Sequence, residues 1–315
     1  MVRIAGETLH VFFLGTAGAL PTTNRNPPCI MVRHGSQTLL FDCGEGAQQQ
    51  MMRARTGFAV DAVFITHWHA DHFLGLFGLA HTLSFMGRTE PLAVYGPEGV
   101  HEFCELVRRL SRFSLGFPMQ ATEIGPGAEV HFPGFTVTAF ATQHGMPGLG
   151  FALRESARPG RFNRERAIEL GIPPGPLFGR LQRGETVSIA RNGDVIAVPP
   201  DQVLGPPRPG RSVVYTGDTR PICRQIGDVA QNADLLIHDA TFEDADAERA
   251  REVFHSTAGE AGEAAAALGV RRLALVHISS RYTSAGNHVR DAKKKYGGEV
   301  TAPSDLTVIE LPFRE

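Results

Sequence analysis

The segment His-Trp-His-Ala-Asp-His at residues 67–72 constrains this chain more than any other feature. Four of its six side chains are metal-ligand types, and it directly follows the apolar run DAVFIT. Burying four such groups side by side is costly unless a metal ion binds them. The imidazoles of His67 and His69, two residues apart on a loop that leaves a strand, can converge on one metal ion, and Asp71 and His72 can turn toward a second. The spacing argues against a chance cluster of surface histidines and predicts a metal site at the end of a strand.

Further candidate ligands are single residues at the ends of predicted strands. His144 follows the run FTVTAFATQ, Asp218 follows RSVVYTG, and His277 follows RRLALV. Each position alone is weak, since a lone histidine is more often structural than liganding. Together with residues 67–72 they complete a set of strand-end ligands that is drawn from both halves of the chain.

Apolar, β-rich runs separated by turns recur along the chain. The predicted strands are 8–15, 29–34, 37–44, 61–66, 91–96, 135–142, 211–218, 233–240, 271–279 and 305–312. Helical spacing occurs at 45–55, 73–86, 97–112, from 256 or 257 onward, and near 286–297. Pro97 suits the first turn of its helix. Two β-rich halves with outer helices predict an α/β layered sandwich, a single domain over residues 1–315.

A stretch at 154–210, here called the arm, interrupts this pattern. It is dense in Pro, Gly and Arg, a composition from which we expect no core of its own and which is typical of a projecting arm or a long functional loop. We therefore expect that removing about 156–182 spares the fold and the metal site. Residues 154–184 contain seven arginines and only three glutamates. The arginines are at 154, 158, 161, 164, 166, 180 and 183. A solvated loop without a partner is the alternative.

Composition limits the remaining classes. With 315 residues, 42% of them hydrophobic, the chain can bury a large core without cross-links. It has no secretory signal pattern and no bilayer-length apolar run, so we expect a cytoplasmic protein with no membrane partner. The four cysteines form no C-x-x-C pair, which indicates reduced thiols that mostly fill the core.

Charge argues against a DNA-binding domain. The net charge is −2 and the pI about 6.7, so any contact with nucleic acid must be local, and we expect no DNA partner. Of the 31 Lys and Arg residues, three are lysines, at 293–295, and the other 28 are arginines. Arginine suits bidentate phosphate contacts, although a GC-rich genome explains the bias equally well.

The strand-end ligand pattern resembles the metallo-β-lactamase superfamily over nearly the whole length. The resemblance implies an αβ/βα four-layer sandwich with the arm inserted. It further implies that His67, His69 and His144 hold one divalent metal ion, that Asp71, His72 and His277 hold another, and that Asp218 bridges them. The ions are expected to be Zn²⁺, or Mn²⁺, since sites of nitrogen and oxygen ligands follow metal availability.

That arrangement implies metal-hydroxide chemistry. Two metal ions about 3.5 to 4 Å apart lower the pKa of a shared water toward about 7 and clamp the attacking and leaving oxygens of an in-line displacement. Asp71 could also orient that water or accept its proton.

Closer features resemble the ribonuclease Z family, the tRNA 3′-processing endonucleases. The loop LGTAGALPTTNRNPP ends in Arg25-Asn26, expected to contact substrate, although Thr23 stands where the family often has Lys. GDTRP at 217–221 matches the family, His-Asp-Ala-Thr at 238–241 has Asp239 in place of Glu, and His-Ser-Thr at 255–257 is intact.

The resemblance also implies individual roles. His255 lies beside the scissile phosphate, where an imidazolium could stabilise charge and protonate the leaving oxygen. Ser256-Thr257 could equally cap the following helix. Arg281 is a possible phosphate contact, and His238 is expected to support a ligand rather than to be one. The remaining histidines, 10, 34, 81, 101, 131 and 288, are expected to be structural or on the surface.

The arm resembles the exosite that grips tRNA in this family and usually reaches across a homodimer. The resemblance therefore implies precursor tRNA as the substrate, a homodimer, and substrate contacts from arm arginines. The candidates are Arg158, Arg161, Arg164, Arg180 and Arg183.

Three alternatives stay open. A small-molecule hydrolase of the same superfamily, arylsulfatase-like or a cyclic-nucleotide phosphodiesterase, would share every metal ligand and differ in the arm. A non-enzymatic RNA-binding module would not need the complete ligand set. A flavodiiron-type oxidoreductase would carry an additional Glu ligand and a flavodoxin-like domain.

Overall fold

The computed structural model describes residues 8–110, 115–191, 194–221 and 226–314. These residues form two compact units. The larger comprises the chain up to Arg154 and resumes at Arg211, and the smaller comprises Glu155–Gly210 with Arg314.

Two seven-stranded sheets build the larger unit. The first runs in the order β18 (Val308–Glu310), β1 (Leu9–Gly15), β3 (Cys29–His34), β4 (Gln37–Phe41), β5 (Ala62–Phe64), β6 (Leu92–Gly96) and β7 (Met119–Glu123). The second runs in the order β17 (Glu299–Thr301), β15 (Arg272–Val276), β14 (Leu235–Asp239), β13 (Ser212–Tyr215), β10 (Leu149–Glu155), β9 (Phe135–Ala141) and β8 (Glu129–Phe132). A short parallel pair of β2 (Ala17–Gly18) and β16 (Ile278–Ser279) adds to these.

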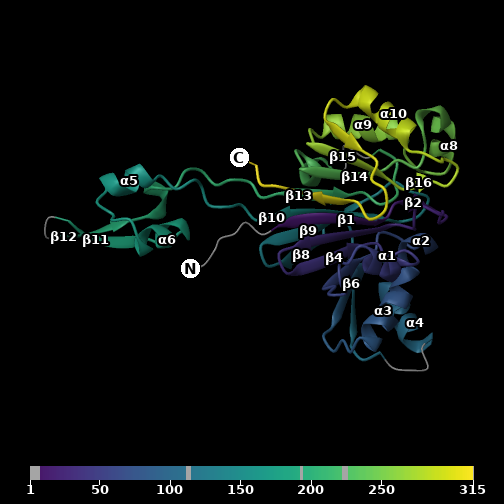
Figure 1. The fold of residues 1–315 in the computed structure, drawn as a ribbon, viewed down its shortest axis with the longest axis horizontal. Coiled ribbons are helices and arrows are strands. Elements are labelled where there is room, and N and C mark those ends of the chain that lie inside the picture. Colours follow the sequence, from purple (N-terminus) through teal and green to yellow (C-terminus); the bar gives the residue numbers. More distant parts are fainter. Residues whose placement is uncertain (1–7, 111–114, 192–193, 222–225, 315) are drawn as a thin grey trace. The chain divides into compact units, whose positions relative to one another are not determined.

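Helices cover the outer face of each sheet (Figure 1). Those of the first half are α1 (Ala47–Arg53), α2 (Ala70–Phe73), α3 (Gly75–Phe85) and α4 (Val100–Leu110). Those of the second half are α7 (Gly227–Ala230), the 3-10 helix η2 (Asp244–Asp246), α8 (Ala247–Glu252), α9 (Ala258–Ala267) and α10 (Gly286–Lys295). No helix within the described residues is both long and apolar enough to cross a bilayer.

Three apolar clusters fill the spaces between these four layers. One lies between the sheets and takes alternate residues of β1, such as Val11 and Phe13, because successive strand residues face opposite sides. A second packs the other face of the first sheet on α1, α3 and α4, and a third packs the second sheet on α9 and α10. The predicted αβ/βα four-layer sandwich is thus confirmed.

Some local predictions were wrong. The helical spacing predicted at 73–86 corresponds to two helices, α2 and α3, and α2 begins earlier, at Ala70, so that it carries Asp71 and His72. The helix predicted from Pro97 begins at Val100, since Gly99 has φ +100°, outside the helical region. Strands β7, β8, β10 and β17 were not predicted. Cys29, Cys43 and Cys104 are buried as expected, whereas Cys223 lies outside the described residues.

The smaller unit contradicts the expectation that the arm has no core. It contains α5 (Arg164–Glu169), α6 (Pro176–Gln182), the hairpin β11 (Val187–Arg191) and β12 (Asp194–Val198), and the 3-10 helix η1 (Pro200–Gln202). Its buried apolar residues are Ala167, Ile172, Leu181, Val187, Ile189, Val198 and Val203.

The Pro and Gly residues of the arm serve its turns and helix starts. Pro176 begins α6, and Gly171 and Gly184 have positive φ values of 86° and 84° after the two helices. Because the core residues come from short elements on both sides of residue 182, removing only 156–182 would take away part of the hairpin's apolar core. The premise of that expectation is therefore wrong, and its outcome for the fold and the metal site stays a prediction.

Candidate metal centre

Strand ends from both sheets place the seven predicted ligands. His67 and His69 follow β5, Asp71 and His72 lie on α2, His144 follows β9, Asp218 follows β13 and His277 follows β15. Loops at one edge of two packed sheets can approach one another, which is how residues more than 200 positions apart meet here.

The first group consists of His67, His69, His144 and Asp218. Its ring nitrogens lie 2.9 Å apart between His67 Nε2 and His69 Nδ1, and 3.1 Å apart between His69 Nδ1 and His144 Nε2. Asp218 Oδ2 is 3.7 Å from His67 Nε2. Ligand atoms of a tetrahedral metal ion at about 2.0–2.2 Å lie about 3.3–3.6 Å from one another, so the three spacings fall on either side of this range and small shifts of the side chains would let them hold one ion.

The second group consists of Asp71, His72 and His277. Asp71 Oδ2 lies 3.6 Å from His72 Nε2 and 3.5 Å from His277 Nε2. Asp218 Oδ2 lies 3.3 Å from both of these nitrogens. The same carboxylate oxygen therefore borders both groups, which suits a bridging ligand.

The buried polar atoms of the centre fit a metal ion. His72 Nε2, His277 Nε2 and Asp218 Oδ1 are buried without a hydrogen-bond partner among the described residues. Such atoms are costly to leave unpaired, and imidazole nitrogens with carboxylate oxygens are ligands that divalent ions such as Zn²⁺ accept.

The pKa values of the buried histidines also fit metal binding. Burial and the neighbouring imidazole of His72 hold the pKa of His67 well below its usual value, so His67 is in the neutral, liganding form. Burial also lowers the pKa of His72, but the carboxylates of Asp218 and Asp42 raise it well above the usual value. These carboxylates thus favour a positive charge at this position, which is the charge that a metal ion provides.

Beside the second group, His255 forms a network with Asp239 and Thr241, and together with Asp218 and His277 it makes a third set of side chains close enough to hold a metal ion. Its Nδ1 lies 2.8 Å from Asp239 Oδ2, and its ring stacks on that of His277 at 5.0 Å. Thr241 Oγ1 contacts both Asp239 Oδ1 at 2.7 Å and His277 Nδ1 at 2.8 Å. Burial lowers the pKa of His255, but Asp239 raises it, to about 9. The carboxylate of Asp239 thus reaches His255, although the ribonuclease Z family has the longer Glu at this position.

Arg25 and Asn26 contact their own chain. Arg25 Nη1 donates to Thr16 Oγ1 at 2.5 Å and to Pro303 O at 2.7 Å, and the backbone N–H of Asn26 donates to Asp305 Oδ2 at 2.7 Å. These contacts hold the loop after β1, and direct substrate contacts by the two side chains stay a prediction.

The other predicted contact residues differ in their surroundings. Arg281 lies 3.8 Å from Asp246 and over the Phe242 ring at 5.0 Å. In the smaller unit, Arg180 and Arg183 each bind Glu185 at 2.9 Å, and Arg161 and Arg164 are exposed.

Sequence reasoning did not single out Asp42 or Tyr215. Asp42 follows β4 and accepts hydrogen bonds from His72 Nδ1 at 2.7 Å and Tyr215 Oη at 2.8 Å. The only sign of a functional role for Asp42 in the local sequence is that it is an acidic residue at the end of an apolar strand. His238 is buried, with Nδ1 2.7 Å from Asp239 O, and joins no ligand group among the described residues.

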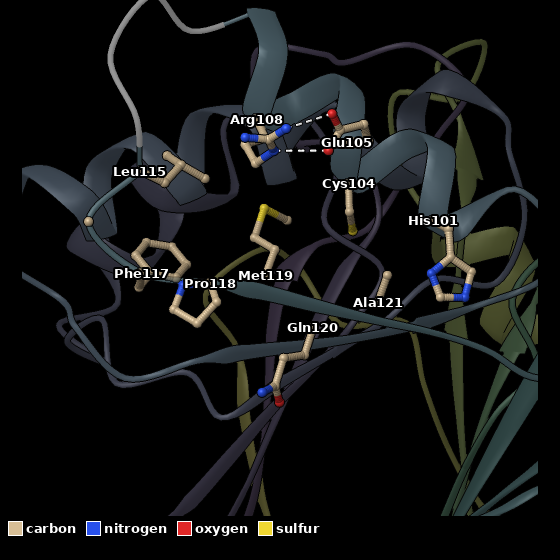
Figure 2. A pocket seen from close by; sticks show the side chains of 11 residues that line it. His101, Cys104, Glu105, Arg108, Leu115, Phe117, Pro118, Met119, Gln120 and Ala121 are labelled. Atoms are coloured by element: carbon tan, nitrogen blue, oxygen red, sulfur yellow. Dashed lines mark hydrogen bonds and ion pairs between the residues drawn. The ribbon is translucent and has the colours of Figure 1, made fainter.

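A hollow of about 810 Å³ lies elsewhere, between α4 and β7 (Figure 2). Cys104, Met119 and Phe117 line it, and Arg108 pairs with Glu105 at its rim at 2.7 Å. None of the seven predicted ligands lines it, so it does not belong to the candidate metal centre.

Comparisons with known proteins agree with this geometry. Residues 22–177 match the metallo-beta-lactamase superfamily, and residues 203–278 match the beta-lactamase superfamily domain. Human tRNase Z, short form, is similar in structure, with a TM-score of 0.70 and 27% sequence identity over 96% of this chain and 100% of that one. The fold and the site thus define a metal-dependent hydrolase of the metallo-β-lactamase superfamily.

Sequence comparison with curated proteins identifies the family within this superfamily. The chain is 50% identical to ribonuclease Z of Methanosarcina acetivorans over 307 residues, which are 97% of this chain and 99% of that relative. It is 46% identical to ribonuclease Z of Myxococcus xanthus over 98% of this chain and 99% of that relative. The chain belongs to the ribonuclease Z family.

Proposed function

We propose that the chain is an endoribonuclease that removes 3′ trailers from precursor tRNA by hydrolysing one phosphodiester bond at a centre of two metal ions. The observation that carries this proposal is the convergence of seven side chains into two ligand groups that share Asp218 Oδ2. The similarity to ribonuclease Z over nearly the whole chain supports the choice of substrate.

Each ligand group holds one ion in this proposal. His67, His69 and His144 hold the first, Asp71, His72 and His277 hold the second, and Asp218 bridges them. When bound, the ions supply an activated water as the nucleophile and neutralise charge on the phosphate oxygens. Zn²⁺ suits the donor set best, and Mn²⁺ is the alternative.

The chain's own residues orient the reactants and move the protons. Asp71 Oδ2 is held by the backbone N–H of Ala19 at 3.0 Å and is available to orient the nucleophilic water and take up its proton. His255, held as an imidazolium by Asp239, donates a proton to the leaving 3′ oxygen as the phosphorus–oxygen bond breaks. The products are a tRNA with a 3′-hydroxyl and a trailer with a 5′-phosphate.

The smaller unit is the exosite in this proposal. Arg161, Arg164, Arg180 and Arg183 are exposed, and guanidinium groups suit phosphate contacts. Glu185 lies between two of them and holds their side chains in place, which reduces the entropic cost of binding.

A homodimer is part of the proposal and rests on exposed apolar side chains. Met52 on α1 and Phe85 near the end of α3 are 65% and 90% exposed, and α1 and α3 contact each other. Large exposed apolar side chains on helices that contact each other favour an interface. Cytoplasmic location stays a prediction.

The deciding experiment is incubation of the purified protein with a 3′-extended precursor tRNA, followed by mapping of the product ends. We expect one cut at the 3′ end of the mature tRNA, either after the discriminator base or after an encoded CCA. Treatment with a chelator should abolish the cut, and Zn²⁺ or Mn²⁺ should restore it. Hydrolysis of small phosphodiesters without cleavage of precursor tRNA would favour the small-molecule hydrolase.

A further inference from the structure

A buried tyrosine connects the two halves of the metal centre. The hydroxyl of Tyr215, on β13, donates a hydrogen bond to Asp42 Oδ2 at 2.8 Å. Tyr215 is 3% exposed and Asp42 is fully buried. The two residues come from different sheets, because Asp42 follows β4 of the first sheet and β13 belongs to the second.

Asp42 orients two of the proposed ligands. Its Oδ2 lies 2.7 Å from His72 Nδ1, and as a carboxylate it only accepts, so the proton resides on Nδ1 and leaves Nε2 free to bind a metal ion. Its Oδ1 accepts from the backbone N–H of Thr66 at 2.8 Å and from Thr66 Oγ1 at 3.0 Å. Thr66 Oγ1 then accepts from His67 Nδ1 at 2.9 Å, which leaves Nε2 of that ring free as well.

The end of β13 lies directly against this network. A Cβ added at Gly217 would come within 2.8 Å of Thr66 Cγ2, so the backbone there approaches Thr66 closely. One residue further on, Asp218 Oδ2 lies 3.3 Å from His72 Nε2. Tyr215 therefore fixes Asp42 from the same strand end that carries the bridging carboxylate.

We propose that Tyr215 is a positioning residue of the metal centre: its hydroxyl holds Asp42, and through Asp42 it sets His72 at the correct distance from Asp218. This role rests on the proposed function, because it requires that His72 and Asp218 bind a common ion. The residue touches no reacting atom, so it acts through the affinity and geometry of the centre.

The ring and the hydroxyl of Tyr215 can be separated by Tyr215→Phe. The ring packs in the core near that of Phe41, at 6.3 Å between centroids, and Phe keeps this packing. The substitution removes only the donor to Asp42 Oδ2. Tyr95→Phe is a matched control, because the Tyr95 ring stacks on Phe64 at 4.8 Å and its hydroxyl has no hydrogen bond within the part of the chain that the structure describes.

The primary measurement is zinc affinity, by competition with a chromophoric chelator, together with the number of ions bound. We expect wild type and Tyr95→Phe to bind two zinc ions each, and we expect the two proteins to have the same affinities for them. Tyr215→Phe should bind one of the two ions about 10-fold more weakly, the lower end of the range for partners of metal ligands. Without metal, Tyr215→Phe should melt lower than the other two proteins, because a hydrogen bond to a buried carboxylate is lost. The difference should be larger with metal bound.

A double-mutant cycle with Asp42→Asn provides the second test. If Tyr215 acts through Asp42, adding Tyr215→Phe to Asp42→Asn should weaken zinc binding by less than about 2-fold. Unchanged zinc affinities in Tyr215→Phe, or an equal loss of melting temperature with and without metal, would overturn the positioning role alone. Wild-type protein that binds neither Zn²⁺ nor Mn²⁺ would overturn the proposed function and this role with it.

Discussion

Among the residues that the structure describes, the carboxylate of Asp218 borders both ligand groups, with Oδ2 between 3.3 and 4.0 Å from four ring nitrogens. We predict that Asp218→Ala abolishes hydrolysis and lowers the bound metal, because two cations would be left to repel each other without a shared anion. Metal analysis and a phosphodiesterase assay measure this. Asp228→Ala, at an exposed position on α7, should behave as wild type. Near-normal activity with two ions still bound to Asp218→Ala would contradict the assignment.

His255 stands outside the seven proposed ligands but stacks on one of them, His277. We predict that His255→Ala keeps nearly all bound metal and lowers turnover by about 10²- to 10⁴-fold, the usual effect of losing a general acid or base. Turnover on precursor tRNA and metal content are measured on the same preparation. The exposed His131→Ala serves as the control. Loss of metal from His255→Ala would show that the residue is a ligand instead.

Individual residues were predictable where their chemistry is local. The segment at 67–72 indicates a metal site by spacing alone, whereas Asp42 and Tyr215 gain their importance only from a contact between residues 173 positions apart. The resemblance placed Arg25 and Asn26 at the substrate, but their hydrogen bonds to Pro303 and Asp305 depend on the far end of the chain and could not be seen in the sequence.

At the scale of elements, α9 has a complete capping box. Thr257 Oγ1 accepts from the backbone N–H of Glu260 at 3.2 Å, and Glu260 Oε2 accepts from the backbone N–H of Thr257 at 2.9 Å. We predict that Thr257→Ala lowers the free energy of unfolding by about 1 kcal/mol, the typical effect of losing such a cap. Urea denaturation measures it. Thr257→Ser keeps the hydroxyl and should lose less than half as much, so equal losses in the two variants would argue against the cap.

Most elements with a clear apolar pattern were predicted, although β10 is largely buried and apolar and was still missed. The strands β1, β3 and β14 are largely buried and apolar, so their sequences identify them. In contrast, β7 and β8 lie at sheet edges and are mostly exposed, which removes the apolar pattern. The four-residue α2 is too short for a helical period, and the sequence indicated helical spacing only from residue 73 onward.

At the scale of the whole molecule, the order of strands and helices predicted a layered α/β sandwich and the family resemblance implied its four layers, but composition misjudged the arm. A core of seven small or medium apolar residues drawn from α5, α6, β11, β12 and the connecting turns has no period that a sequence reveals. The structure therefore changes how the arm must be removed in an experiment. The excision has to include the whole smaller unit.

The strands that flank the arm provide the junction for that excision. Strands β10 and β13 pair antiparallel, with Arg154 opposite Ser212, so Glu155 and Arg211 can be joined by a two-residue Asn-Gly turn in place of residues 156–210. We predict that this variant folds, binds two metal ions and hydrolyses bis(p-nitrophenyl) phosphate at a rate close to that of wild type. These three measurements are the controls for the tRNA experiment.

The variant without the arm and the wild-type protein should differ in how tightly they bind precursor tRNA. We expect the variant to bind precursor tRNA much more weakly than wild type does. The slope of log affinity against log salt concentration should also become less steep, by about 0.7 to 0.9 for each phosphate-binding arginine that is removed. The candidate arginines are Arg158, Arg161, Arg164, Arg180 and Arg183. Affinity is measured at several salt concentrations with catalytically inactive Asp218→Ala forms of both proteins. The small substrate needs only the metal centre, whereas tRNA extends far beyond it, so the two substrates report on different parts of one molecule. Unchanged tRNA affinity and an unchanged salt slope would mean that the arm is no exosite, and the small-molecule hydrolase would then be the better interpretation.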